Sequence, residues 1–321
     1  MFNIVQHRKW FFLFSGFVIL AGIISMIISI STYPEHSPVR LSIDFRGGTL
    51  FEFQFLGDKP TSEITGEMID AKFIEAGVTE VRHQRLGQDA ENRWQVRSDY
   101  LNDAGTKKVE SLLADLAKTA GMDYKTLRST TVSPTVGSQV TTAALIAVIV
   151  ASIAVLGWIA FAFRGVTDSW RYGTCAVLAM IHDVLVMAGV MSIMGLVFGW
   201  EADSLFLTGL LTVVGYSVQD TIVVFDRIRE NAARHRGEPY EMIINRSILE
   251  TLQRSIAMQL VVGFVLIALF LIGGETIRQF VGILLIGLLS GTYSSTFTAI
   301  PLLVAWDHGQ LPLISRRPAN A

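Results

Sequence analysis

The sequence predicts a polytopic α-helical membrane protein with six transmembrane helices and one α+β external domain between the first two helices. The 321-residue chain is 51% hydrophobic and only 17% charged, whereas a soluble domain carries about 25% charged residues. The shortage of charge is confined to long apolar runs, and residues 40–133 have an ordinary soluble composition. Within that segment the hydrophobic period follows the order β-α-β-β-α-β, which is the ferredoxin-like arrangement.

The net charge argues against a nucleic-acid partner, and the cysteine content excludes an internal disulfide. The formal net charge is -2, so the chain has no basic field for nucleic acid, and we expect no nucleic-acid partner. The single cysteine, Cys175, lies in an apolar run and cannot form an internal disulfide. We expect no metal and no bound cofactor.

The first apolar run covers residues 10–31 and follows a cluster of three basic or titratable residues, His7, Arg8 and Lys9. A run of about 20 residues can span the hydrocarbon core. It is longer than the apolar core of a signal peptide. We therefore expect a retained helix, with residues 1–31 forming the cytoplasmic N-terminus and the first span.

Residues 32–135 are predicted to form the external domain. Phe51, Phe53 and Phe55 alternate with polar residues, which is the strand period. Residues 61–76 are expected to be helical, with Ile64, Met68 and Ala71 on one face. Further strands are expected at 78–86, around 94–97 and at 124–132. Residues 103–120 are the clearest amphipathic helix, because their apolar residues recur three and four positions apart.

Five more apolar runs predict the remaining spans, within residues 136–306, and a cytoplasmic tail at 307–321. They cover residues 140–163, 172–198, 205–225, 256–272 and 280–306. Arginine and lysine in short loops mark the cytoplasmic side. They gather at the N-terminus, between the second and third spans, between the fourth and fifth spans, and in the tail, which includes Arg316 and Arg317. Both termini are therefore predicted to be cytoplasmic and residues 32–135 to be outside.

Two carboxylates interrupt the apolar runs, Asp183 in the third and Asp220 in the fourth. Placing an ionisable side chain inside a membrane costs at least a few kcal/mol of free energy, so we take such a residue as a candidate functional residue. Arg254 precedes the fifth run, and its predicted depth matches that of Asp220. A pair of Asp220 and Arg254 that forms in one conformation and breaks in another would load and release a proton.

Structural explanations of the same residues stay open. Asp183, beside His182, is equally consistent with a hydrogen-bonding group between helices. Arg254 is consistent with a side chain that reaches to the interface. Asp226 and Arg229 have the spacing of neighbours on a helix and predict an interfacial charge cluster.

The sixth run contains a Gly-x-x-x-Gly step, Gly287 and Gly291, followed by Ser294, Ser295 and Thr296. Small residues at this spacing let two helices approach closely in a membrane. We interpret this stretch as a helix-packing surface and not as a site.

Three motifs resemble the SecD/SecF family of protein-export membrane proteins, and within it the SecF type. They are DFRGGT from Asp44 to Thr49, HDV from His182, and GYSVQDTIVVFDRIREN from Gly215 to Asn231. The resemblance covers nearly the whole chain. Gln219 stands where the family usually has Asn. The motif residues that the resemblance marks are Asp44, Phe45, Gly47, Gly48, Thr49, His182, Asp226 and Arg229.

The resemblance implies a relative of the RND (resistance–nodulation–division) transporters that uses the proton motive force to assist protein export, and not an enzyme. It implies that Asp220 is the protonatable carboxylate, that Arg254 is its basic partner and that Asp183 assists. Protons would be the coupling ion. The implied partners are SecD, YajC, the SecYEG translocon, unfolded preprotein and the lipid bilayer. The implied location is the bacterial inner membrane, with residues 32–135 periplasmic.

Two other functions are considered, a small-solute proton antiporter of the RND type and a scaffold for SecD and the translocon. An antiporter would need a drug-sized pocket in its external domain, and one modest domain argues weakly against it. The contexts of Asp183 and Asp220 do not resemble those of intramembrane aspartyl proteases, which disfavours that third class.

Overall fold

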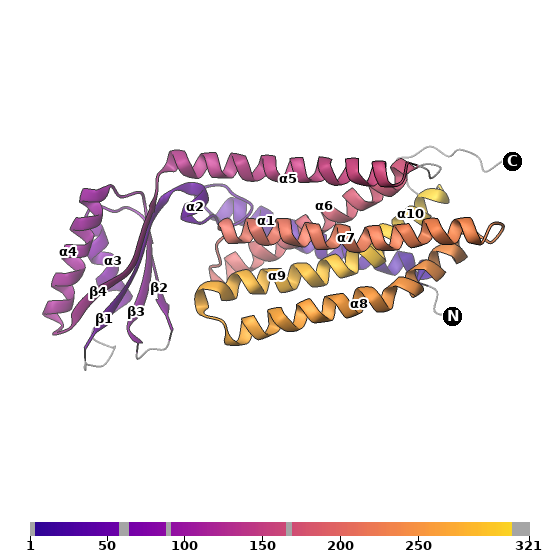
Figure 1. Ribbon diagram of the computed structural model, residues 1–321. Helices are drawn as coiled ribbons and strands as arrows, with labels where there is room; N and C mark the ends of the chain where they lie inside the picture. The colour runs from indigo at the N-terminus through magenta and orange to yellow at the C-terminus, as the bar shows by residue number, and fades with distance from the viewer. Residues whose placement is uncertain (1–3, 58–63, 88–90, 165–168, 310–321) are drawn as a thin grey trace. The chain divides into compact units, whose positions relative to one another are not determined.

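The computed structural model in Figure 1 describes residues 4–57, 64–87, 91–164 and 169–309. The chain divides into two compact units. One is a sheet unit, Leu41–Leu145, and the other is a helical unit formed by Met1–Arg40 and Ile146–Ala321. Arg316 and Arg317 lie outside the described residues.

The described strands of the sheet unit form one antiparallel, four-stranded sheet in the order β2-β3-β1-β4. The strands are β1 (Gly48–Leu56), β2 (Val81–Leu86), β3 (Arg93–Ser98) and β4 (Asp123–Val132). Two helices, α3 (Gly66–Glu75) and α4 (Asp103–Thr119), complete the sequence order β-α-β-β-α-β. The order of strands and helices that the hydrophobic period predicted is confirmed.

The core of the sheet unit lies between one face of the sheet and the two helices. The alternation in β1 buries Phe51, Phe53 and Phe55, each at most 2% exposed. From α4, Val109 and Leu113 join the same cluster, as their helical spacing predicted. Each helix is preceded by an N-cap residue whose side chain accepts a hydrogen bond from a backbone N–H of the first turn. The N-cap is Thr65 for α3 and Asn102 for α4.

The buried face predicted for the helix at residues 61–76 is wrong. Helix α3 begins at Gly66, and the cap at Thr65 leaves the buried Ile64 before the helix. Ile69 and Phe73 are the residues that α3 buries, whereas Met68 is 39% exposed. Starting the helix near residue 61 displaced the expected face by about one position along the chain. The residues 61–63 lie outside the described part of the chain.

The glycine pair Gly47 and Gly48 joins the short helix α2 (Ile43–Arg46) to β1. Both have positive φ, +83° and +135°, which L-residues with side chains rarely adopt. A Cβ on Gly47 would lie 2.7 Å from the Cα of Pro134, and one on Gly137 would lie 2.7 Å from the Gly47 nitrogen. The pair is therefore required where the backbone before β1 crosses the start of α5 (Pro134–Ala162).

Six helical segments of the described residues are long and apolar enough to cross a membrane. Beside α5 these are α1 (Arg8–Thr32), α6 (Ser169–Phe198), α7 (Ser204–Arg234), α8 (Tyr240–Ile272) and a broken sixth segment. The sixth consists of α9 (Glu275–Ser294), a five-residue π-helix (Ser295–Ala299) and α10 (Ile300–Asp307). The six predicted spans are confirmed as helices.

Helices α7 and α8 run well beyond the apolar stretches from which they were predicted. Their polar ends are joined by ion pairs that the hydrophobic pattern does not reveal. Arg227 of α7 binds Glu250 of α8 at 2.6 Å, and Asn231 donates to Glu250 at 2.8 Å. Arg254 consequently lies within α8 and not at its start.

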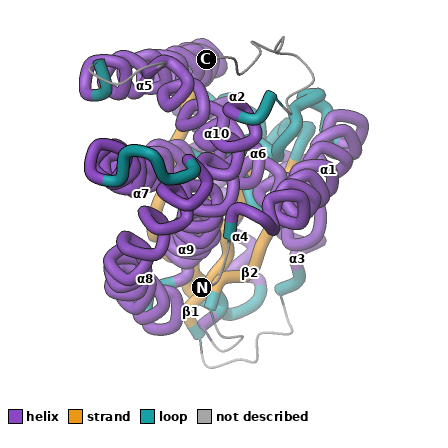
Figure 2. The backbone as a smooth tube through the Cα atoms, turned by 90° about the vertical axis from the view of Figure 1, so that its right-hand side faces the viewer, coloured by secondary structure: helices purple, strands orange, loops and turns teal. Residues whose placement is uncertain are grey.

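Helix α9 lies against α6, α7 and α8, as the end-on view in Figure 2 shows. The Gly-x-x-x-Gly step makes the contact with α7, because a Cβ on Gly287 would lie 2.4 Å from Val213. Gly291 faces Ser217 in the same way, at 3.2 Å. The predicted packing role of these two glycines is confirmed.

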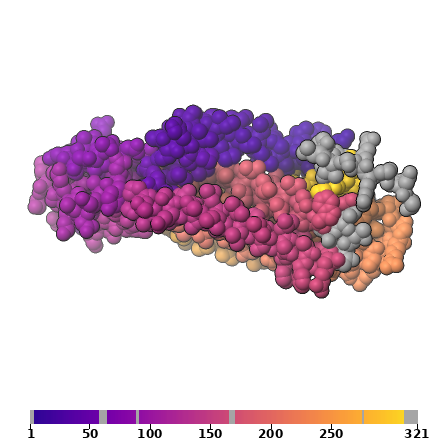
Figure 3. Space-filling model, turned by 90° about the horizontal axis from the view of Figure 1, so that it is seen from above, coloured from indigo at the N-terminus to yellow at the C-terminus, as the bar shows by residue number. Residues whose placement is uncertain are grey.

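Helices α1 and α5, indigo and magenta in Figure 3, carry exposed apolar side chains. Phe17 of α1 is 68% exposed, and Trp158 of α5 is 61% exposed. Such faces suit lipid or another membrane-spanning bundle. The polar residues described next lie between the helices instead.

Candidate functional site

Asp183 of α6 is completely buried among hydroxyl groups. Within the described residues, three serines donate to its carboxylate, Ser217 of α7 at 2.6 Å and Ser290 and Ser294 of α9 at 2.8 and 2.7 Å. The adjacent His182 places Nδ1 3.2 Å from the same carboxylate, and its ring stacks on Tyr293. Three helices thus meet at Asp183.

Asp220 of α7 is 8% exposed and is also held by serine hydroxyls. Ser255 of α8 donates to Oδ1 at 2.5 Å, and Ser295, the first residue of the π-helix, donates to Oδ2 at 2.7 Å. A hydroxyl can donate to a carboxylate or turn to accept from a carboxylic acid. Both clusters can therefore accommodate either protonation state of their aspartate.

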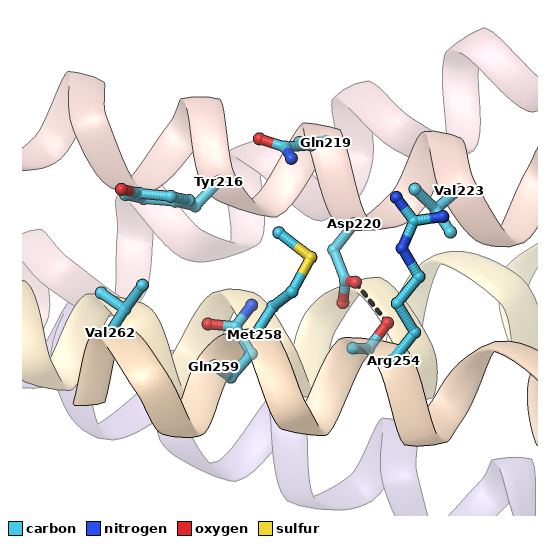
Figure 4. A pocket seen from close by; sticks show the side chains of 9 residues that line it. Tyr216, Gln219, Asp220, Val223, Arg254, Met258, Gln259 and Val262 are labelled. Atoms are coloured by element: carbon cyan, nitrogen blue, oxygen red, sulfur yellow. Dashed lines mark hydrogen bonds between the residues drawn. The ribbon is translucent and has the colours of Figure 1, made fainter. Parts of the chain in front are cut away.

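One side of Asp220 faces an open pocket between α7 and α8. Tyr216, Gln219, Arg254 and Gln259 are among its polar lining residues, and Met258 and Val262 are among its apolar ones. Figure 4 shows the dashed hydrogen bond at Asp220 and the Arg254 side chain reaching from α8 toward Val223 of α7. The pocket gives Asp220 a route to the exterior of the helical unit that the fully buried Asp183 lacks.

Arg254 and Asp220 line the same pocket but do not form an ion pair. Among the described side chains, no contact within 4 Å joins the Arg254 guanidinium to the Asp220 carboxylate, and Ser255 occupies the bonding position. The hypothesis that these two residues pair is not met in this conformation. The physical reason is that α8 turns Ser255, and not Arg254, toward α7 at the height of Asp220.

The two clusters meet on one helix. Ser294 binds Asp183, and the next residue, Ser295, binds Asp220. The hydroxyls of Ser217 and Ser294 also lie 3.4 Å apart. In a regular α-helix, the side chains of consecutive residues point about 100° apart. The helix turn is wider in the π-helix that begins at Ser295.

The sequence pattern does not identify these serines as part of the site, because Ser294 and Ser295 follow a Gly-x-x-x-Gly step that indicates a packing surface. Their hydroxyls instead bind both buried carboxylates. Ser290 and Ser294 do lie four positions apart, on one face of an apolar helix. That spacing is a signal for hydrogen bonds across helices, but it does not name the partner.

The remaining motif residues do not belong to the hydrogen-bond clusters of Asp183 and Asp220. Asp44, Phe45, Gly47, Gly48 and Thr49 belong to the sheet unit, where Thr49 accepts the backbone N–H of Leu101 at 3.0 Å. Asp226 and Arg229 form an exposed ion pair at 2.5 Å near the end of α7, as their spacing predicted. Arg229 also donates to the Ala162 carbonyl at the end of α5.

Residues 112–309 match the family described as "Protein export membrane protein SecD/SecF, C-terminal", and residues 36–55 match "SecD/SecF GG Motif". The chain is 42% identical to the protein translocase subunit SecF of Thermobaculum terrenum, over 99% of this chain and 98% of that protein. It is 43% identical to SecF of Anaerolinea thermophila, over 97% of this chain and 96% of the relative.

Among solved structures, the chain is similar to the crystal structure of SecDF from Thermus thermophilus, described as a translocon-associated membrane protein. The TM-score is 0.75 with 28% identity, and the match covers 96% of this chain and 39% of that one. A second SecDF structure, in the "Super-membrane-facing form", matches with a TM-score of 0.64. The chain therefore spans about two fifths of the length of SecDF.

Proposed function

The chain belongs to the SecD/SecF family of protein-export membrane proteins, and we propose that it acts as a protein translocase subunit of the SecF type. With SecD it uses the proton motive force to assist protein export. The observation that carries this proposal is similarity to SecF subunits over nearly the full length of both chains. That similarity favours export over a small-solute antiporter, and it favours a transport component over an enzyme.

The same proposal gives the sheet unit a ferredoxin-like fold and an external position. Its strand order β2-β3-β1-β4, together with the element order β-α-β-β-α-β, supports the first point. The excess of arginine in the loops at the opposite ends of the spans supports the second. The chain then lies in the bacterial inner membrane with both termini cytoplasmic and residues 32–135 periplasmic.

Asp220 is the proposed proton-binding residue. It combines burial in a candidate span with access to an open pocket, which a proton-exchanging carboxylate requires. Protonation removes its charge and converts one acceptor position into an O–H donor. The serine that faces this O–H, Ser255 on α8 or Ser295 on the π-helix, must then accept instead of donate, so the contact of α7 with that segment changes.

Arg254 and Asp183 have supporting roles in this scheme. Arg254 places a permanent positive charge in the pocket through which Asp220 exchanges its proton, and an opposite charge nearby favours the carboxylate. Asp183 is joined to α7 and α9 by its serines. It therefore fixes the helices between which Asp220 acts.

The partners of this subunit would be SecD, YajC, the SecYEG translocon and unfolded preprotein. Co-purification tests the assembly: the full-length chain, extracted in mild detergent, is expected to bring SecD and SecYEG with it. A chain recovered only as a dimer of itself would contradict the assignment and would fit an antiporter.

Labelling with a hydrophobic carbodiimide tests the proton site. The reagent reacts with protonated carboxyl groups in apolar surroundings, and peptide mass spectrometry locates the product. Labelling at Asp220 is expected to fall as pH rises and to be absent from Asp220→Asn. Labelling that is independent of pH, or that occurs only elsewhere, would remove Asp220 from the proton path.

A further inference from the structure

We propose that Ser294 and Ser295 are positioning residues that couple the proton occupancy of Asp183 to that of Asp220. The inference rests on the proposed function only in taking Asp220 to exchange protons. It adds that the two aspartates do not titrate independently, and that the junction between α9 and the π-helix links them.

The first observation is that consecutive residues hold carboxylates from two different helices. Ser294 donates to Oδ2 of Asp183 on α6 at 2.7 Å, and Ser295 donates to Oδ2 of Asp220 on α7 at 2.7 Å. Both serines are completely buried. A displacement of the backbone at this junction therefore changes both bonds together.

The second observation is that each serine has an alternative acceptor within reach. The hydroxyl of Ser294 lies 3.2 Å from the Gly291 carbonyl, and that of Ser295 lies 3.1 Å from the Thr292 carbonyl. A hydroxyl carries one hydrogen. When its aspartate is a carboxylate, the serine donates to it. When the aspartate is protonated, the serine accepts from the acid and its own hydrogen turns to the carbonyl.

The third observation connects the two switches. The Gly291 carbonyl that receives the Ser294 hydroxyl also accepts the backbone N–H of Ser295. When Asp183 is protonated, the Ser294 hydroxyl donates its hydrogen to the Gly291 carbonyl. The hydrogen bond from the backbone N–H of Ser295 to the same carbonyl then becomes weaker. The position of Ser295, and with it the hydrogen bond to Asp220, thereby depends on the state of Asp183.

Few other titratable or charged side chains face this cluster from the packed helices. Among the described residues they are His182 on α6, Tyr216 on α7, Arg254 on α8 and Tyr293 on α9. The π-helix, with the sequence STFTA, contributes none. The proposed coupling therefore runs between the two aspartates, with His182 beside Asp183 and Arg254 near Asp220.

Infrared difference spectroscopy of the full-length chain in lipid tests the coupling, because a protonated carboxyl group has its own carbonyl-stretch band. The Asp220 band is assigned by its loss in Asp220→Asn, and its midpoint is followed against pH. We expect Asp183→Asn to move this midpoint by about one pH unit, the size at which two sites titrate as a pair. In a Ser294→Ala background the same substitution should move it little.

Matched variants separate this link from simpler effects. Ser290→Ala removes another donor to Asp183 but leaves the junction intact, so the shift should persist. Ser192→Ala removes a buried hydroxyl bound only to other serines among the described residues, and it too should leave the shift intact. Ser295→Ala breaks the link at its other end and should abolish the shift, whereas Ser294→Thr keeps a hydroxyl and should restore it.

Three results would overturn the proposal. A shift that survives both Ser294→Ala and Ser295→Ala would mean that the two charges interact directly, with Asp220 still a proton site. A shift that Ser290→Ala abolishes equally would mean that any donor to Asp183 suffices. An Asp220 band that does not titrate at all would refute this inference and the proposed proton site together.

Discussion

At the scale of single residues, serine hydroxyls replace the expected arginine as the immediate partners of the buried carboxylates. Asp220 is held by Ser255 and Ser295, while Arg254 lines the pocket beside it. Hydroxyls can reverse their hydrogen bonds without moving a charge through the membrane. The site is thus arranged to accept either protonation state of Asp220, with Arg254 in the adjoining pocket.

The structure predicts that Arg254 contributes to function and little to stability. Its side chain is exposed and lies in the pocket, so Arg254→Met should change the free energy of unfolding by no more than about 0.5 kcal/mol. Gradient-dependent export should nevertheless fall, because the charge beside Asp220 is lost. Thermal unfolding and an export assay on the same preparation measure the two effects.

The adjacent Gln253 provides the matched control, since it is also exposed on α8 but does not line the pocket. Gln253→Met should leave both stability and export near their original values. If Arg254→Met exports normally under a proton gradient, the guanidinium is only an interfacial anchor. That result would return Arg254 to its structural explanation.

The sequence identified the two aspartates but not the residues that bind them. A carboxylate within an apolar run is conspicuous because its burial is costly, and Asp183 and Asp220 were therefore found. Serine is common in membrane helices and inexpensive to bury, so Ser217, Ser255 and Ser295 carry no comparable signal. Which serine meets which carboxylate depends on how α7, α8 and α9 pack, and the apolar periodicity does not contain that information.

At the scale of elements, close helix contacts depend on glycine. Adding a methyl group at Gly287 would place it 2.4 Å from Val213 of α7. Gly287→Ala is therefore expected to force α9 from α7 and to cost about 1–3 kcal/mol, the usual penalty for overpacking. The fall in thermal unfolding temperature measures this loss.

The control is Gly157→Ala on α5, where a methyl group would meet nothing within 4 Å. This variant should unfold at an unchanged or slightly higher temperature, because alanine favours a helix. Equal stability of the two variants would show that α7 and α9 are not packed as closely as described.

The glycine pair before β1 gives a second prediction at this scale. Gly47 has φ +83° and ψ 169°, a region open essentially to glycine alone. The strained conformation alone is expected to lower the free energy of unfolding by about 1–3 kcal/mol when alanine replaces Gly47. Gly47→Ala also adds a clash at 2.7 Å with Pro134, so its total loss should be larger. Protease resistance of the sheet unit within the full-length chain reports the effect.

Gly77→Ala is the comparison for that experiment. Gly77 also has a positive φ, +98°, but open space surrounds its Cβ position. Its substitution should therefore produce strain without a clash, and a smaller loss of resistance. Equal losses of protease resistance would mean that the close approach of α5 is not the reason why position 47 requires glycine.

The hydrophobic period predicted the elements well and their ends poorly. Alternation in β1 and helical spacing in α4 are strong local signals, and both elements lie where they were expected. The ends of α7 and α8 were misjudged, because ion pairs such as Arg227 with Glu250 extend the helices beyond the apolar stretches. Such contacts join residues 23 positions apart and leave no periodic trace.

At the scale of the whole molecule, we propose that proton binding at Asp220 changes the contact of α7 with α8 or with the π-helix. One charge crossing about 100 mV releases about 2.3 kcal/mol. That energy biases a two-state element, but a nearly complete switch takes about 5.5 kcal/mol. More than one proton is therefore needed at modest potential, which a second coupled carboxylate at Asp183 would help to supply.

The most direct test is preprotein export into vesicles that contain the purified subunit with SecD and SecYEG, with and without an imposed proton gradient. The parent chain, Asp220→Asn and Asp307→Asn are compared; Asp307 is a 43% exposed carboxylate at the end of α10. We expect the gradient to stimulate export for the parent and for Asp307→Asn but not for Asp220→Asn, although all three assemble with SecD. Equal stimulation of all three would contradict it and would leave this subunit as a scaffold.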